Sequence, residues 1–79
     1  MDHENILKDV QCGVSLEVVK IDGGTEFRSR LHSLGLYEGK IIQKICSVKL
    51  GGPVLVEVDR AQIAIGKRMA SKIFVKLVK

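Results

Sequence analysis

Tryptophan is absent from this chain of 79 residues, and Phe27, Tyr37 and Phe74 are its only aromatic residues. Apolar residues nevertheless make up 46% of the sequence and charged residues 28%, which is the balance of a folded domain. A core built from isoleucine, valine and leucine is therefore expected. A chain of this length folds as a single domain, 1–79, and buries about 62% of its unfolded surface, which leaves little room for a large enclosed active site.

Long apolar runs are missing as well. No run approaches the roughly 18–20 residues that a membrane-spanning helix needs. The polar, acid-containing start of the chain, MDHENILKD, resembles neither a signal peptide nor a transit peptide, so we expect the protein in the cytoplasm. Because Cys12 and Cys46 stand apart without a CxxC spacing, we expect both to be free thiols in that reducing compartment.

Motifs for catalysis are not found either. The spacing of serines, histidines, cysteines and carboxylates indicates no nucleophile–base arrangement and no carboxylate pair on one element. Gly23-Gly24 and Gly51-Gly52 are turn signals that fall outside the glycine-rich phosphate-binding motifs. Cys12, His32 and Cys46 are too scattered to indicate a metal site. The sequence therefore gives little support to a hydrolase.

Positive charge is in excess and unevenly spread. The net charge is +4, and the last thirteen residues contain five bases and no acid. This end of the chain would attract nucleic acid, an acidic protein surface or anionic lipid. Lysines that protect edge strands from aggregation are the simpler interpretation. The scarcity of aromatic residues for base stacking argues against an RNA-binding domain.

Glycines and one proline divide the chain into short segments, a spacing typical of a small barrel or sandwich. The apolar pattern predicts five strands, the first with a bulge or an edge position, at 15–21, 40–48, 54–58, 61–65 and 72–78. Asp59-Arg60 is expected to form a hairpin turn, and 66–71 a helical turn. Ile6, Leu7 and Val10 are expected to cover one end of the core. We expect a closed all-β barrel, since an open five-stranded sheet with one short helix would leave a face uncovered.

One helix of about ten residues is predicted between the first two strands. Thr25 is expected to be its N-cap, and Glu26 adds negative charge to the first turn. Phe27, Leu31 and Leu34 would form one apolar stripe. Gly35 follows where a helix C-terminus requires a positive φ.

The helix and the turn after it contain the candidate partner-binding residues, which are Arg28, Arg30, Leu31, Leu34, Gly35, Leu36 and Tyr37. One of Leu34 and Leu36 has to face outward unless the turn folds back. An exposed leucine or tyrosine beside arginines is typical of a docking surface. The alternative is that both leucines belong to the core. Phe74 is either a second exposed anchor or covered by the helix.

Several short motifs follow one another along the chain: Gly23-Gly24, Arg28-x-Arg30-Leu31, Leu34-Gly35-Leu36, Gly39, Gly51-Gly52-Pro53-Val54, Ile63-Ala64-Ile65-Gly66 and Ala70-x-x-Ile73-x-Val75. In this order and spacing they resemble the ferrous iron transport protein A (FeoA) family, from about Leu7 to Val75. The resemblance implies a small SH3-like five-stranded barrel, similar to the C-terminal domain of iron-dependent repressors. Arg60 stands where the family often has glycine, and a positive φ at this residue would strain the turn.

This resemblance also implies a function. The protein would be a small cytosolic accessory of a bacterial ferrous iron uptake system, without enzymatic activity. It would dock on the cytosolic, GTPase-bearing part of the FeoB membrane permease and modulate transport. The alternative is a transition-metal-responsive binding domain similar to the SH3-like domain of the repressors. Weak binding of a transition-metal ion such as iron is then implied, although the sequence shows no ligand set for it.

Overall fold

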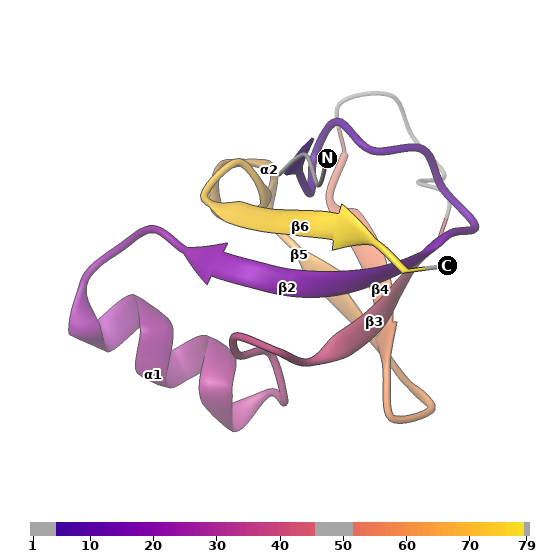
Figure 1. Cartoon of the computed structure of the whole chain (residues 1–79). Coiled ribbons are helices and arrows are strands. Elements are labelled where there is room, and N and C mark those ends of the chain that lie inside the picture. The colour runs from indigo at the N-terminus through magenta and orange to yellow at the C-terminus, as the bar shows by residue number, and fades with distance from the viewer. Residues whose placement is uncertain (1–4, 46–51, 79) are drawn as a thin grey trace.

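The computed structural model describes residues 5–45 and 52–78. Within these ranges it contains the strands β1 (Asn5–Ile6), β2 (Ser15–Ile21), β3 (Ile41–Ile45), β4 (Val54–Val58), β5 (Ala61–Ile65) and β6 (Ile73–Leu77) and the helices α1 (Thr25–Ser33) and α2 (Lys67–Ala70). The strands form one antiparallel sheet in the order β1-β6-β2-β3-β4-β5, with α1 inserted between β2 and β3 (Figure 1).

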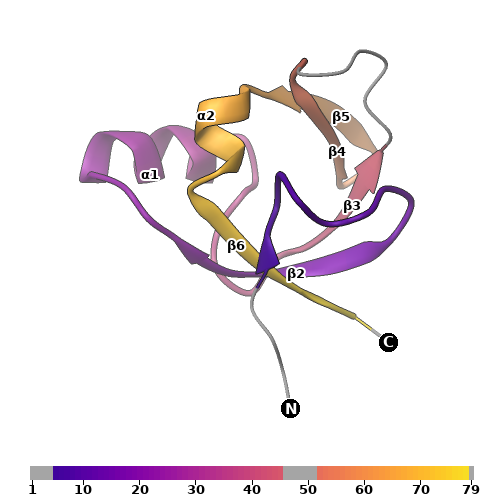
Figure 2. The ribbon, with the colours of Figure 1, turned by 90° about the horizontal axis from the view of Figure 1, so that it is seen from above.

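The all-β class with one inserted helix is confirmed, whereas the strand count is not. The described residues form six strands rather than five, because Asn5 and Ile6 pair with Val75 and Phe74. A strand of two residues is too short to produce an alternating pattern in the sequence. The sheet curves around the core (Figure 2). Each strand is hydrogen-bonded to the next in a linear order that begins at β1 and ends at β5. Among the described residues it is thus a strongly bent sheet rather than a fully hydrogen-bonded cylinder.

The concave side of the sheet encloses an aliphatic core. Its buried residues are Leu7, Leu16, Val18, Ile21, Leu31, Leu36, Ile42, Val54, Val56, Val58, Ile65, Ala70, Ile73 and Val75. The pairing of β2 with β6 shifts register between Val18 and Lys20, which confirms the predicted bulge. A bulge adds one residue to a strand and interrupts the alternation of inward and outward side chains. It therefore explains why the consecutive residues Val18 and Val19 are both apolar.

Lys44 is the exception to the apolar core. It lies on the inward side of β3, and only 7% of it is exposed. Its ammonium donates hydrogen bonds to the carbonyls of Lys8 at 3.1 Å and Val10 at 2.5 Å. Burial lowers the pKa of Lys44, an effect that the nearby charge of Asp9 opposes. The lysine therefore fastens the segment before β2 to the sheet, a role that its apolar neighbours in the sequence do not reveal.

The hairpin between β4 and β5 turns at Asp59 and Arg60, as predicted. Both residues have a positive φ, 50° and 73° respectively, as a type I′ turn requires. The strain expected at Arg60 is therefore present, because a side chain disfavours this conformation. Lys40 reaches across from the start of β3, and its ammonium lies 2.7 Å from both carboxylate oxygens of Asp59.

The cysteine prediction is wrong for Cys12, which is disulfide-bonded in the structure. The prediction depended on a reducing compartment and on the absence of a CxxC motif. Neither of these indicates which residues lie close together in the folded chain. Cys46 lies outside the described residues. So does the end of the second predicted strand, which was expected to continue to Val48.

Candidate docking surface

Helix α1 begins without a side-chain cap. Thr25 is the first helical residue rather than the N-cap, which is Gly24. The first helical hydrogen bond runs from the N–H of Arg28 to the carbonyl of Gly24 at 3.0 Å. The ring of Phe27 packs so closely over Gly23 that a β-carbon on Gly23 would collide with it. Gly23 therefore lets the chain enter the helix close to the ring of Phe27.

The end of α1 is a Schellman motif. Leu36 donates its N–H to the carbonyl of Leu31 at 2.9 Å, and Gly35 donates its N–H to the carbonyl of His32 at 2.9 Å. Gly35 has a φ of +91°, which confirms the predicted glycine terminus. This turn brings Leu36 back onto the core beside Leu31, and both side chains are fully buried.

The same turn directs Leu34 outward. Leu34 is 45% exposed and Tyr37 is 40% exposed. The predicted stripe of three apolar residues is therefore wrong at Leu34, because the helix has ended before it and the chain has changed direction. Of the two alternatives for the leucines, the structure shows the one in which Leu36 is core and Leu34 faces solvent. Phe27, the first member of the stripe, is partly buried against the core.

Charged and aromatic side chains surround the exposed pair. Arg28 approaches Glu38 across the turn, with 3.4 Å between nitrogen and oxygen. The rings of His32 and Tyr37 lie 5.1 Å apart at an angle of 37°. The ammonium of Lys40 lies 5.9 Å from the centre of the Tyr37 ring. The residues His32, Glu38 and Lys40 were not among the predicted site residues. Only the folded turn brings His32 and Lys40 to Tyr37, and Glu38 to Arg28.

Of the seven predicted site residues, Arg28, Arg30, Leu34 and Tyr37 are exposed, whereas Leu31 and Leu36 lie in the core and Gly35 shapes the turn. Phe74, the other residue considered as an anchor, is half-buried on β6. The ammonium of Lys20 lies 6.0 Å from its ring centre. The exposed part of the predicted site is thus confined to α1 and the turn that follows it, and we call Arg28, Arg30, Leu34 and Tyr37 the helix-end surface.

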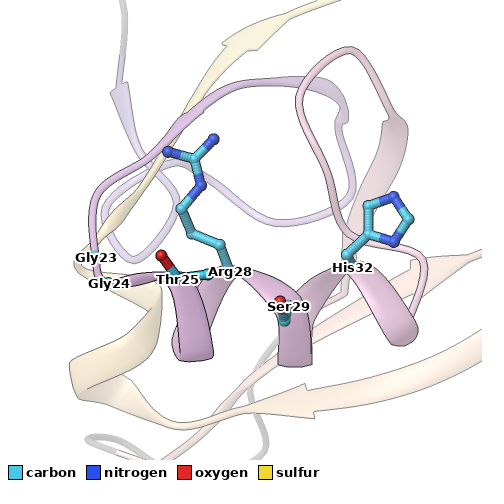
Figure 3. Close-up of a pocket in the computed structure, with 6 residues that line it drawn as sticks. All are labelled: Gly23, Gly24, Thr25, Arg28, Ser29 and His32. Carbon is cyan, nitrogen blue, oxygen red and sulfur yellow. The ribbon is translucent and has the colours of Figure 1, made fainter.

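The hollows next to this surface are open. One lies along the start of α1 and is lined by Gly23, Gly24, Thr25, Arg28, Ser29 and His32 (Figure 3). In this view Arg28 and His32 leave the helix at separate points and do not converge on a common centre. A second hollow of about 270 Å³ lies between α1 and the turn, and is lined by Ile21, Arg28, His32, Leu36, Tyr37 and Glu38. The two hollows are therefore better suited to contact with the surface of a partner than to catalysis on an enclosed substrate.

Metal-binding side chains do not gather in the part of the chain that the structure describes. There, no three residues among the histidines, cysteines, aspartates and glutamates lie close enough together to hold an ion. The described residues therefore do not fit a resident transition-metal site. None of the described helices is both long and apolar enough to cross a membrane.

Comparisons with known proteins agree with this architecture. The sequence model of the FeoA domain matches residues 6–77. A crystal structure of an iron uptake regulatory protein (FeoA) is 33% identical, with a TM-score of 0.86, and the match covers 96% of this chain and 100% of the other. The solution structure of the FeoA protein from Chlorobium tepidum is 24% identical, with a TM-score of 0.86, over 95% of this chain and 71% of the other.

The fold is shared with metal-dependent regulators as well. A manganese-dependent transcriptional repressor is 18% identical, with a TM-score of 0.85, and the match covers 99% of this chain but 44% of the repressor. The likeness is thus to one part of that protein, and it shows the SH3-like fold alone. The comparison with curated protein sequences found no match.

Proposed function

Because this chain belongs to the FeoA family, we propose that it is a non-enzymatic, cytosolic accessory protein of ferrous iron uptake that docks on the GTPase-bearing part of the FeoB permease. The observation that carries this proposal is the exposure of Leu34 and Tyr37 at the end of α1. Two large apolar side chains held outward by a rigid turn, with arginines beside them, have the composition of an interface hot spot.

The helix-end surface would act through two kinds of contact. Leu34 and Tyr37 would enter an apolar groove of the partner, where their burial supplies affinity. Arg28 and Arg30 would attract acidic side chains around that groove, which mainly speeds association and selects the partner. Leu31, Gly35 and Leu36 would hold the surface in place without touching the partner. By binding one conformation of the permease more tightly than another, the protein would shift the conformational equilibrium of the permease.

The test is a titration of ¹⁵N-labelled protein with the isolated cytosolic part of the cognate permease. We expect the amide signals of residues 28–37 to shift, and Leu34→Ala to weaken binding about tenfold or more, as the loss of a hot-spot residue does. Leu77→Ala is the matched control, because Leu77 is a 57% exposed leucine at the end of β6. The proposal fails if the helix-end signals do not move, or if the two leucine variants bind equally well.

A metal-responsive binding domain is the second candidate, supported by the fold shared with the manganese-dependent repressor. This likeness extends to the backbone but not to a ligand set among the described residues. Adding Fe(II) anaerobically to the labelled protein would test it. Saturable changes at a few carboxylate, histidine or cysteine residues would favour this candidate over docking.

A further inference from the structure

A second surface feature lies away from the helix-end surface, between α2 and the segment that follows β1. It is a hollow of about 310 Å³ lined by Lys8, Lys67, Arg68 and Ser71. The two segments are far apart in the sequence but lie side by side in the fold (Figures 1 and 2). Three of the four lining residues are cations and none is an acid, so the hollow attracts anions.

The wall that carries Lys8 is held firmly. Leu7, the preceding residue, is fully buried, and its N–H donates to the carbonyl of Ile73 at 2.8 Å. The carbonyl of Lys8 itself accepts a hydrogen bond from the buried ammonium of Lys44. The backbone of Lys8 is therefore anchored on both sides, while its side chain remains exposed.

The opposite wall is held in a similar way. Ala70 of α2 is fully buried, and its N–H donates to the carbonyl of Gly66 at 2.8 Å. The hydroxyl of Ser71 donates to the carbonyl of Arg68 at 2.6 Å, which ties the end of α2 to its middle. Because the backbone on both walls is already ordered, a ligand would order little more than the side-chain ends, which lowers the entropic cost of binding.

The three cations are also available to a ligand. Among the residues that the structure describes, Lys8, Lys67 and Arg68 form no ion pair. The neighbouring acid, Asp9, acts on the ammonium of Lys44 rather than lining the hollow. A guanidinium and two ammonium groups around one concave surface match the charge and the several oxygen acceptors of a phosphate group.

From this arrangement we propose that the hollow between Lys8 and α2 binds a phosphate group, carried either by a small soluble ligand or by an anionic lipid headgroup. Arg68 would donate to two phosphate oxygens, and Lys8 and Lys67 would approach from the two walls. The site is separate from the helix-end surface, so it does not depend on the proposed docking.

Inorganic phosphate is the first probe, titrated at constant ionic strength in a buffer free of phosphate. We expect saturable amide shifts confined to Lys8, Lys67, Arg68, Ser71 and their neighbours. The double variant Lys8→Gln/Arg68→Gln should weaken this binding at least tenfold. The matched control Lys20→Gln/Arg60→Gln removes the same charge at residues outside both proposed sites, and should change the affinity less than twofold.

Vesicles distinguish the two sources of phosphate. The protein is sedimented with phosphatidylcholine vesicles that either contain or lack phosphatidylglycerol. Binding of inorganic phosphate without vesicle binding supports a soluble ligand, whereas binding that requires phosphatidylglycerol supports a headgroup. In both cases only the Lys8→Gln/Arg68→Gln variant should lose binding. The proposal is overturned if neither probe binds, or if the control variant loses as much binding as the double variant, since the effect would then be one of net charge.

Discussion

The amide of Leu36 donates to the carbonyl of Leu31 at 2.9 Å where α1 ends, and both side chains are fully buried in the core. Leu34 lies between them in the sequence but faces solvent. Leu34 is exposed because the hydrogen bonds of the turn fix the direction of the chain at the end of α1. The helix-end surface therefore depends on these hydrogen bonds. Different substitutions should therefore affect the stability of the protein and its binding to a partner.

Gly35 sustains this turn, and Gly35→Ala should destabilise the protein by about 1–2 kcal/mol. The residue has a φ of +91°, and a β-carbon would lie 3.1 Å from Cγ1 of Val58. Gly39→Ala separates the two causes, since Gly39 has a φ of +92° but no atom within 4 Å of the added carbon. Urea unfolding should show the larger loss for Gly35→Ala. An equal loss would mean that the contact with Val58 is unimportant.

The two leucines around Gly35 should respond in opposite ways. Leu36→Ala creates a cavity in the core and should cost about 2–5 kcal/mol of unfolding free energy. Leu34→Ala should change this free energy by no more than about 0.5 kcal/mol, because the side chain is largely in water already. Chemical denaturation of both variants measures the difference. Similar losses in the two variants would contradict the assignment of one leucine to the core and the other to the surface.

Arg60→Gly should stabilise the protein by about 0.5–1 kcal/mol, which corresponds to a rise of a few degrees in Tm. Glycine adopts the φ of 73° without strain. The free energy gained by relieving this strain should exceed the cost of the larger conformational entropy that glycine gives the unfolded chain. Arg60→Ala is the control, since alanine keeps the strain and should not raise Tm. Calorimetry compares the three proteins. A gain in both variants would point instead to removal of the charge.

Lys44→Met should lower stability near neutral pH by about 1–3 kcal/mol, because the carbonyls of Lys8 and Val10 lose their donor. Burial lowers the pKa of Lys44 below its usual value of 10.5. Between the folded-state pKa and 10.5, the unfolded chain binds more protons at this residue than the folded protein does. The stability that Lys44 contributes therefore rises with pH in this window.

Methionine does not titrate, so the difference in unfolding free energy between the natural protein and Lys44→Met isolates this effect. Urea titrations at a series of pH values up to 10.5 should show that the difference increases with pH. A difference that falls as the pH rises would mean that the folded protein favours the charged ammonium, contrary to the burial of this side chain.

Local patterns in the sequence were sufficient for most of the fold. The strand Ser15–Ile21 has the predicted bounds and bulge, Gly35 ends the helix as expected, and Asp59-Arg60 forms the hairpin turn. These features depend on residues close together in the chain, through alternation, helix periodicity and the conformations that glycine permits. The order of the glycine motifs also carried the resemblance to the FeoA family, which the match over residues 6–77 bears out.

Contacts between distant segments were decided only by the tertiary structure. Four features depend on residues whose spacing in the sequence carries no local signal. They are the pairing that makes β1 a strand, the hydrogen bonds of Lys44 to the segment before β2, the disulfide of Cys12 and the hollow that both Lys8 and Arg68 line. The choice between Leu34 and Leu36 belongs to this group, because it depends on how the turn packs against the sheet. Alternation and helix periodicity describe neighbours along the chain, whereas burial is set by what the folded chain places opposite each side chain.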